Sequence, residues 1–191
     1  IRSGDIRILP DDVAIGSIEF VHERLRASGA EPPPPNDYPD VVHEFLLRDI
    51  ARTTLGDARK QIAESGYRAM FVKPADKLKR FAGFVTTDPL DSRFNGAGSK
   101  TSVWIAPPVR FVSEWRIYSV KGEVLAIGAA PDNPAFAPEA DRDVIVEIAK
   151  RLFAMPNGFA GICYDVGVLD DGCTALIEVN EGYAFGSYKG C

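Results

Sequence analysis

The chain has 191 residues, of which 46% are hydrophobic and 26% charged, so one globular domain or two small subdomains are expected. Its formal net charge is −5, which argues against a nucleic-acid partner, because a phosphate-binding face needs clustered lysines and arginines. No apolar run is long enough to cross a membrane, so no membrane partner is expected either.

Three cysteines at wide spacing form neither a disulfide framework nor a zinc pattern. We interpret Cys163 and Cys173 as reduced thiols in the core. A reduced state predicts a cytoplasmic protein.

The first third of the chain predicts helices separated by a stiff connector. Helices are expected over residues 17–29, 40–51 and 54–66. Four consecutive prolines within residues 31–39 favour an extended polyproline II spacer. Thr54 can cap the third helix, and Asp57 three residues later completes an opening similar to a capping box.

From residue 68 onward the hydrophobic pattern becomes typical of strands. Strands are expected over residues 69–73, 81–86, 102–106, 114–120, 123–127, 161–169 and 173–180, and a helix over 141–153. Lys121-Gly122 and Asp171-Gly172 are two-residue turns that would close two hairpins. Helices and mostly antiparallel strands in separate blocks predict an α+β fold.

The last hairpin carries the first chemical signal. If Asp171-Gly172 is a two-residue loop, Asp165 faces Glu178 and Cys163 faces Asn180. The two acidic residues and the asparagine then share one face. The opposite face would belong to the core, with Ala175, Ile177 and Val179 against Tyr164, Val166 and Val168.

Two carboxylates that face each other on a hairpin repel by an amount on the order of a few kcal/mol. We therefore expect that one of them is protonated or that a cation lies between them. Carboxylate and amide oxygens are hard ligands that suit Mg²⁺ or Mn²⁺. From the hairpin alone, a solvated polar face is an equally good interpretation.

Basic side chains on other strands precede this hairpin. Lys73 ends an apolar strand, and the loop that follows brings Lys77, Lys79 and Arg80 before Gly83. Arg116 alternates with Glu114 along a later strand. Acidic metal ligands, cations on separate strands and a glycine-bearing loop are what a metal–polyphosphate site needs.

Five motifs in this order resemble the ATP-grasp superfamily, and most of all a compact branch that contains predicted amide-forming ligases. They are FVKP at residues 71–74, KRFAG at 79–83, EWRIY at 114–118, DVG at 165–167 and EVN at 178–180. The resemblance covers residues 68–191, with a weaker likeness around 16–21. It implies two α+β subdomains with mostly antiparallel sheets that grip ATP between them.

On this resemblance the chain divides into three parts. Residues 1–50 would be an N-terminal region, partly like the domain that precedes the ATP-grasp fold and including the connector 31–39. Residues 51–108 would form the N-terminal subdomain, and residues 109–191 the C-terminal subdomain with the metal site.

The resemblance also implies roles for single residues at the phosphate end of the site. Lys73 would contact the α- or β-phosphate, and Lys79 with the loop up to Gly83 would cover the phosphates. Glu114 would hold the ribose hydroxyls. Arg116 would face the transferred phosphoryl group or the carboxylate substrate. The residues implied as ligands of two Mg²⁺ are Asp165, Glu178 and Asn180.

The adenine would rest on the linker from Trp104 to Val109, against the carbonyl of Pro108 and the N–H of Val109. Pro107 departs from the family pattern, which often has an acidic residue near this place, and predicts a weaker hydrogen bond to the adenine amino group. The acceptor site would be bordered by Gly182, Tyr183 and Ser187. The alternative for that last stretch is a flexible glycine-rich loop.

The activity implied is that of an ADP-forming carboxylate–amine ligase, which uses ATP with Mg²⁺ or Mn²⁺ and makes an amide or peptide bond through an acyl phosphate. Its substrates would be small molecules, amino acids or peptides. Two alternatives stay open. One is an ATP-binding regulatory module with reduced catalysis, and the other is a kinase-like phosphotransferase on the same fold.

Overall fold

The computed structural model describes residues 17–32, 34–66, 68–75, 81–156, 160–182, 186 and 188. Its elements are, in chain order, α1 (Ile18–Ala27), the 3-10 helix η1 (Asp40–Leu46), β1 (Ala51–Thr54), α2 (Leu55–Glu64), β2 (Met70–Pro74), β3 (Phe84–Thr86), the 3-10 helix η2 (Ser92–Phe94), β4 (Ser102–Ala106), β5 (Phe111–Val120), β6 (Glu123–Ala129), α3 (Arg142–Ala154), β7 (Gly161–Leu169) and β8 (Thr174–Glu181). No helix in this described part of the chain is long and apolar enough to span a membrane.

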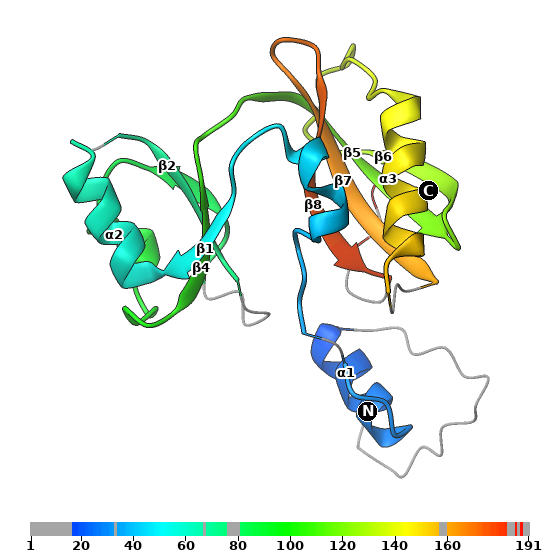
Figure 1. Cartoon of the computed structure of the whole chain (residues 1–191), viewed down its shortest axis with the longest axis horizontal. Coiled ribbons are helices and arrows are strands. Elements are labelled where there is room, and N and C mark those ends of the chain that lie inside the picture. The colour runs from blue at the N-terminus through cyan, green and yellow to red at the C-terminus, as the bar shows by residue number, and fades with distance from the viewer. Residues whose placement is uncertain are drawn as a thin grey trace.

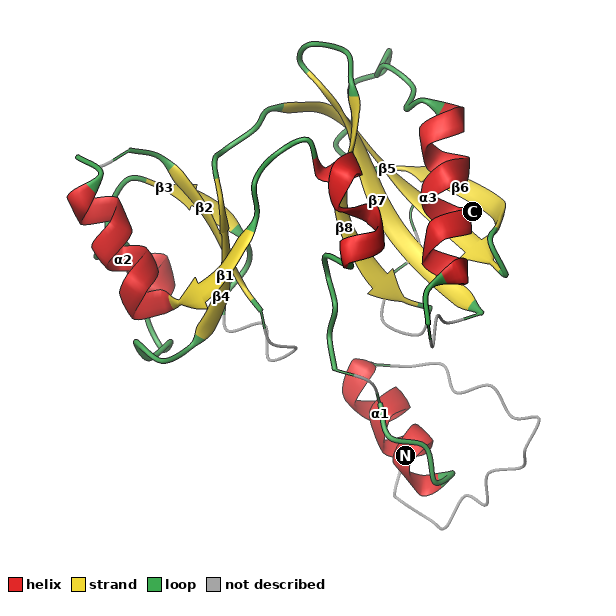
Figure 2. Ribbon diagram, viewed as in Figure 1, coloured by secondary structure: helices red, strands yellow, loops and turns green. Residues whose placement is uncertain are grey.

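The strands form two four-stranded sheets, which lie side by side in Figure 1. The first sheet has the order β1-β4-β2-β3 and the second β6-β5-β7-β8. Every strand pair in them is antiparallel. Helices and antiparallel sheets therefore confirm the expected α+β class, as Figure 2 shows.

Helix α2 covers the first sheet. Its start is capped as expected, because the Thr54 hydroxyl accepts a hydrogen bond from the Asp57 N–H at 3.1 Å. The apolar face of α2 packs into a core with strand residues and Phe94; its buried members are Leu55, Ala58, Ile62, Val72, Phe94, Val103 and Ile105. This core keeps β2 and β4 in place and thereby positions Lys73, which β2 carries.

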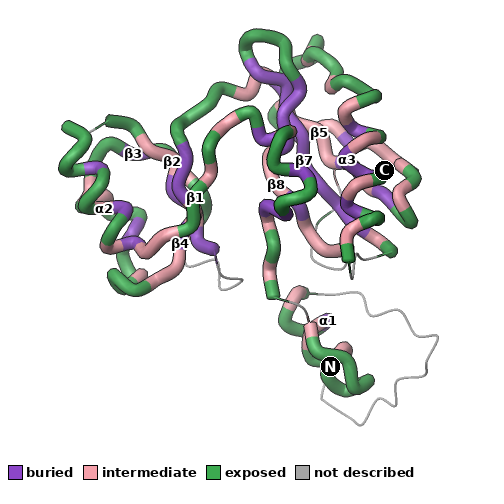
Figure 3. The backbone as a smooth tube through the Cα atoms, in the orientation of Figure 1, coloured by how far each residue is buried: buried purple, intermediate pink, exposed green. Residues whose placement is uncertain are grey.

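The second sheet has its core on the side of α3 and η1. Buried residues include Val42 and Leu46 from η1, and Ile145, Ile148 and Leu152 from α3, packed against Ile117, Tyr164, Val166 and Leu176 of the sheet. Figure 3 shows β7 as a buried strand within this core, and all of its residues after Gly161 are buried. The opposite face of the second sheet is thus left for polar side chains.

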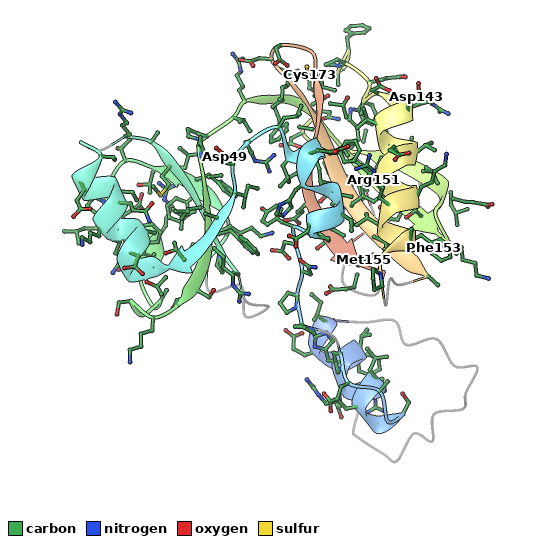
Figure 4. The ribbon with its side chains drawn as sticks, viewed as in Figure 1. Asp49, Asp143, Arg151, Phe153, Met155 and Cys173 are labelled. Atoms are coloured by element: carbon green, nitrogen blue, oxygen red, sulfur yellow. The ribbon has the colours of Figure 1, made fainter. Side chains whose placement is uncertain are left out.

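The predicted helix over residues 40–51 is wrong in type and length. The segment is a 3-10 helix that ends at Leu46, and Leu47 then adopts a positive φ of 51°. After a short connection that contains Asp49, labelled in Figure 4, residues 51–54 form the edge strand β1. Burial of Val42 and Leu46 against the second sheet ends the helix early, and pairing with β4 extends the chain beyond it.

The division of the chain at residues 50 and 108 stays a prediction. The strands of the first sheet lie within 51–108 and those of the second within 109–191. However, η1, which belongs to the predicted N-terminal region, packs into the core of the second sheet.

The predicted two-residue loop in the last hairpin is wrong by one residue. The Leu169 N–H donates to the Cys173 carbonyl at 2.8 Å, so the loop has three residues, and Gly172 adopts φ +89°. A bulge on β8 adds one more residue, because Val166 pairs with Leu176 while Asp165 pairs with Glu178. The two deviations cancel, and the predicted pairing of Asp165 with Glu178 is confirmed.

The bulge also corrects the expected core face of β8. Leu176, rather than Ile177, is fully buried against Val166, and Ile177 is turned toward the polar side of the sheet. Cys163 is buried as expected, but Cys173 is exposed next to the loop and is not a core thiol.

Candidate functional site

A cavity of about 390 Å³ lies between the two sheets. The first sheet contributes β2 and the segment before β3, and the second sheet contributes β5, β7 and β8; the connector that precedes η1 closes one side. The lining residues that carry charge are Asp37, Lys73, Glu114, Arg116, Asp165, Glu178 and Glu181. Both sheets therefore supply charged groups to one cavity.

A second cavity of about 220 Å³ adjoins the first. Its walls include the linker between β4 and β5, with Pro107, Pro108 and Val109, and the apolar side chains of Phe71 and Val85. Glu114 and Glu178 line both cavities. The second cavity is thus mostly apolar, whereas the first is charged.

The structure brings together most of the residues predicted for the site. Those in the first cavity are Lys73, Gly83, Glu114, Arg116, Asp165, Glu178 and Asn180, and those in the second are Glu114, Pro108, Val109 and Glu178. Trp104 lines neither cavity and packs edge-on against Tyr38 instead. Gly182 also lines neither, and its N–H donates to the Gly161 carbonyl. Three predicted residues, Lys79, Tyr183 and Ser187, lie outside the described residues.

Lys73 is held by two carboxylates. Its ammonium group forms ion pairs with Glu178 and, at 2.7 Å, with Asp37, and it lies 5.5 Å from the centre of the Tyr38 ring. Burial alone would lower the pKa of Lys73, but Glu178, Tyr38 and Asp37 together raise it above its ordinary value. Lys73 is therefore fully charged inside the cavity.

Arg116 and Asp165 form a second, bidentate ion pair. Arg116 Nε and Nη2 each donate to one carboxylate oxygen of Asp165, both at 2.7 Å. The Asp165 side chain is only 3% exposed. Burial raises the pKa of Asp165, and the Arg116 guanidinium opposes that rise.

The ion pairs of Lys73 with Glu178 and of Arg116 with Asp165 differ from what the sequence led us to expect of the two facing carboxylates. Asp165 and Glu178 were expected to need a proton or a shared cation. Instead each has its own basic side chain, Arg116 for one and Lys73 for the other. Within the part of the chain that the structure describes, no group of three or more His, Cys, Asp or Glu is placed to hold a metal ion.

The oxygen donors on β8 nevertheless suit a hard cation. Glu178 and Asn180 share a face of the strand, and the Asn180 amide lies 3.2 Å from Glu178 Oε1. The Glu178 carboxylate and the Asn180 amide carbonyl are oxygen ligands of the kind that Mg²⁺ prefers. Glu178 and Asn180 could hold the ion, with Asp165 as a third donor if it releases one bond to Arg116.

Three residues of the site, Asp37, Tyr188 and Arg48, were not predicted. Asp37 comes from the connector, and the Tyr188 hydroxyl donates to Glu114 Oε1 at 3.0 Å. The ring of Tyr188 also lies under the Arg116 guanidinium, 4.0 Å from its Cζ. Arg48, in the second cavity, is the third. Each is far in sequence from its partner, so no local pattern marks it.

Burial raises the pKa of Glu114 above its ordinary value, although the Tyr188 hydroxyl opposes this. Since the folded protein then binds this proton more tightly than the unfolded chain, stability contributed here is present at low pH and falls as the pH rises from about 4.5 through the folded pKa. We expect Glu114→Gln, compared with wild type by urea unfolding at several pH values, to gain relative stability with rising pH. Exposed Glu123→Gln is the control, and an equal pH trend in both variants would contradict the expectation.

Arg48 stabilises the bulge that sets the register of β8. Its guanidinium donates to the carbonyls of Leu46 at 2.9 Å, Leu176 at 2.8 Å and Ile177 at 3.2 Å. The carbonyls of Leu176 and Ile177 belong to the bulge, where the regular hydrogen bonding between β7 and β8 is interrupted. Arg48 thus supports the strand segment that presents Glu178.

Arg48→Met is expected to lower the free energy of unfolding by about 2–4 kcal/mol, because several charge-assisted hydrogen bonds are lost and their carbonyl acceptors are left behind. Urea unfolding measures this. The matched control is Arg52→Met, since Arg52 is exposed and donates to the Ser102 hydroxyl, and it should cost less than about 1 kcal/mol. Equal losses in the two variants would refute the role of Arg48.

Comparison with known proteins places this geometry in a family. The model of the "ATP-grasp domain, R2K clade family 2" matches residues 45–191. No curated protein matches the sequence. Among solved structures, D-cycloserine synthetase DcsG has a TM-score of 0.53 at 16% identity, over 75% of this chain and 59% of that one.

Two further solved structures are similar. D-alanyl-alanine synthetase A from Vibrio cholerae O1 biovar eltor has a TM-score of 0.53 at 15% identity, over 86% of this chain and 64% of that one. The ATP-grasp ligase PsnB, complexed with minimal precursor, Mg and ADP, has a TM-score of 0.50 at 16% identity, over 91% and 60%. At these identities the likeness shows the fold, and this chain spans roughly three fifths of the length of each relative. The resemblance found in the sequence is confirmed, and the chain belongs to the R2K clade of the ATP-grasp family.

Proposed function

We propose that the chain is an ATP- and Mg²⁺-dependent carboxylate–amine ligase, which forms ADP and an amide or peptide bond. The observation that carries the proposal is the cavity between the sheets, where Lys73 and Arg116 meet the oxygen donors of Asp165, Glu178 and Asn180. Membership of the ATP-grasp family and the ligases among its structural neighbours support an ATP-dependent ligase in general terms.

The two adjoining cavities support one placement of the nucleotide. The triphosphate would lie in the charged cavity beside Lys73, below the segment with Gly83. The adenine would lie in the apolar cavity against the linker with Pro108 and Val109. Glu114, which lines both cavities, would then reach the ribose between them.

Close packing around Gly83 supports a tight cover over the phosphates. A Cβ atom at this position would lie 2.9 Å from the Phe71 ring and 3.3 Å from the Cβ of Lys73. A side chain there would displace the groups that shape the cavity. Lys79 is proposed to act from the same loop.

The reaction we propose has two steps. A substrate carboxylate oxygen attacks the γ-phosphorus and ADP leaves, which gives an acyl phosphate. An amine then attacks the acyl carbon, the carbon–nitrogen bond forms and phosphate leaves with the proton taken up by solvent. Lys73 and Arg116 would offset the negative charge that gathers in the first step.

Mg²⁺, when bound by Glu178 and Asn180 with Asp165, would neutralise phosphate charge and orient the triphosphate. Arg116 would contact the transferred group or the substrate carboxylate, and Gly182, Tyr183 and Ser187 are proposed to border the acceptor. No covalent protein nucleophile is needed. PsnB is a structural neighbour solved with a precursor, which supports amino acids or peptides as the substrate class.

Release of ADP tests the proposal. The protein is incubated with Mg·ATP and pooled carboxylic acids, with and without pooled amines, and products are identified by mass spectrometry. ADP that forms in step with an amide, and only when both pools are present, is the expected result. Amine-independent ADP with a stable phosphorylated product would indicate a phosphotransferase, and ATP binding without any turnover would indicate a regulatory module.

A further inference from the structure

The charge around Lys73 is more than balanced before any ligand arrives. The ammonium group carries +1, and its two partners, Asp37 and Glu178, carry −2 together. All three side chains are largely shielded from solvent, with 20%, 19% and 26% exposure. A phosphate that approaches Lys73 therefore meets a cluster with a net charge of −1.

Asp37 is fixed in this position by the backbone. Its carbonyl accepts a hydrogen bond from the Val179 N–H at 2.9 Å, which attaches the connector to the edge of β8. The next residue, Tyr38, is 4% exposed and packs edge-on against Trp104, 5.0 Å between ring centres. The Asp37 carboxylate is thus a built part of the cavity wall, although it precedes the segment 45–191 that matches the family.

Glu178 differs from Asp37 in what else it can bind. Its Oε1 accepts a hydrogen bond from the Asn180 amide nitrogen at 3.2 Å, so the two side chains lie together. The Glu178 carboxylate and the Asn180 carbonyl oxygen are both hard donors for a divalent cation. When Glu178 binds a divalent cation, the net charge of the cluster, counted with the cation, changes from −1 to +1. Among the described residues, Asp37 has no contact with a second side-chain oxygen ligand of this kind, and it stays paired with Lys73.

Building on the proposed function, we propose that Asp37 is a specificity residue for the metal-bound nucleotide. Together with Glu178, it withholds the Lys73 ammonium from nucleotides that arrive without a divalent cation. Once Glu178 is drawn away by the cation, Asp37 alone keeps Lys73 in position for the phosphates. The site then discriminates by charge between Mg·nucleotide and free nucleotide.

The test uses ADP as probe, in EDTA or in Mg²⁺ at equal ionic strength, with dissociation constants from calorimetry. Wild type should bind ADP much more weakly in EDTA. Asp37→Asn keeps the shape and the backbone contact but removes one charge, so it should bind metal-free ADP about five- to tenfold more tightly, with a smaller change in Mg²⁺. Asp37→Ser should also bind metal-free ADP more tightly than wild type.

The matched control is Asp40→Asn, which removes the same charge three residues away from a side chain that is 99% exposed. The ratio of its dissociation constants for ADP in EDTA and in Mg²⁺ should equal that of wild type. If Asp37→Asn and Asp37→Ser also keep the wild-type ratio while Mg·ADP still binds, the inference is overturned and the proposed function stands. If wild type binds ADP in neither condition, the proposed function itself fails, and the inference with it.

Discussion

Replacement of Lys73 by methionine should raise the dissociation constant for Mg·ATP by about 10- to 100-fold. Lys73 is the charged residue of β2, and within the described part of the chain its ammonium group contacts two carboxylates of the same cavity and the Tyr38 ring. A charge-assisted hydrogen bond to phosphate contributes about 1.5–3 kcal/mol, which corresponds to this range. Calorimetry with a non-hydrolysable ATP analogue measures it.

The control for this variant is Lys150→Met, on the exposed face of α3. It removes the same charge from the protein without touching the cavity, so the dissociation constant should stay within about twofold of wild type. An unchanged constant for Lys73→Met would remove Lys73 from the nucleotide site.

Arg116→Met should reduce the free energy of unfolding by about 3–5 kcal/mol, because it leaves the Asp165 carboxylate buried without its bidentate partner. Asp165 already has a raised pKa, and loss of Arg116 raises it further. The folded state then favours the protonated carboxyl, so the variant is least destabilised at low pH and loses stability as the pH rises. Urea unfolding at about pH 4 and pH 7 measures both effects.

Two comparisons isolate the ion pair. The double variant Arg116→Met/Asp165→Asn removes the buried charge and should recover most of the lost stability at pH 7. Arg151→Met is the matched control: this arginine lies on α3, is labelled in Figure 4, and pairs with Glu44 and Glu147 while 36% exposed. It should cost at most about 1 kcal/mol. If Arg116→Met lost as little stability as Arg151→Met, or lost it independently of pH, the Arg116–Asp165 pair would not stabilise the fold in the way described.

Local patterns in the sequence predict the Thr54 helix cap and the existence of both hairpins. Thr54 caps α2 as predicted, and Ser17 and Asp141 cap α1 and α3 in the structure. The predicted helix over 40–51 was wrong because packing of Val42 and Leu46 on the second sheet, whose strands lie between residues 111 and 181, decides where η1 ends. Such long-range contacts leave no periodic signal in a short segment.

The facing pair of Asp165 and Glu178 was predicted correctly from a loop length that was wrong. A three-residue loop shifts the register by one, and the bulge next to Ile177 shifts it back. Arg48 donates to two carbonyls of the bulge and is distant in sequence, so no local pattern marks the bulge. Strand alternation alone therefore placed Ile177 on the wrong face.

The partners of the charged groups were the least predictable part of the site. The sequence indicated which side chains converge, but not that Lys73 pairs with Glu178 or that Arg116 takes both oxygens of Asp165. These pairs depend on the placement of one sheet against the other. The place of Asp37 in the site could not be predicted for the same reason, because Asp37 lies near the end of a segment that resembles a spacer.

A crystal structure with Mg²⁺ and ADP would decide whether the cavity between the sheets is the nucleotide site. The nucleotide is expected between the two sheets, with a phosphate oxygen about 3 Å from Lys73 Nζ, the ion on Glu178 and Asn180, and Lys73 separated from Glu178. Nucleotide bound elsewhere, with Lys73 still paired to both Asp37 and Glu178, would contradict this placement.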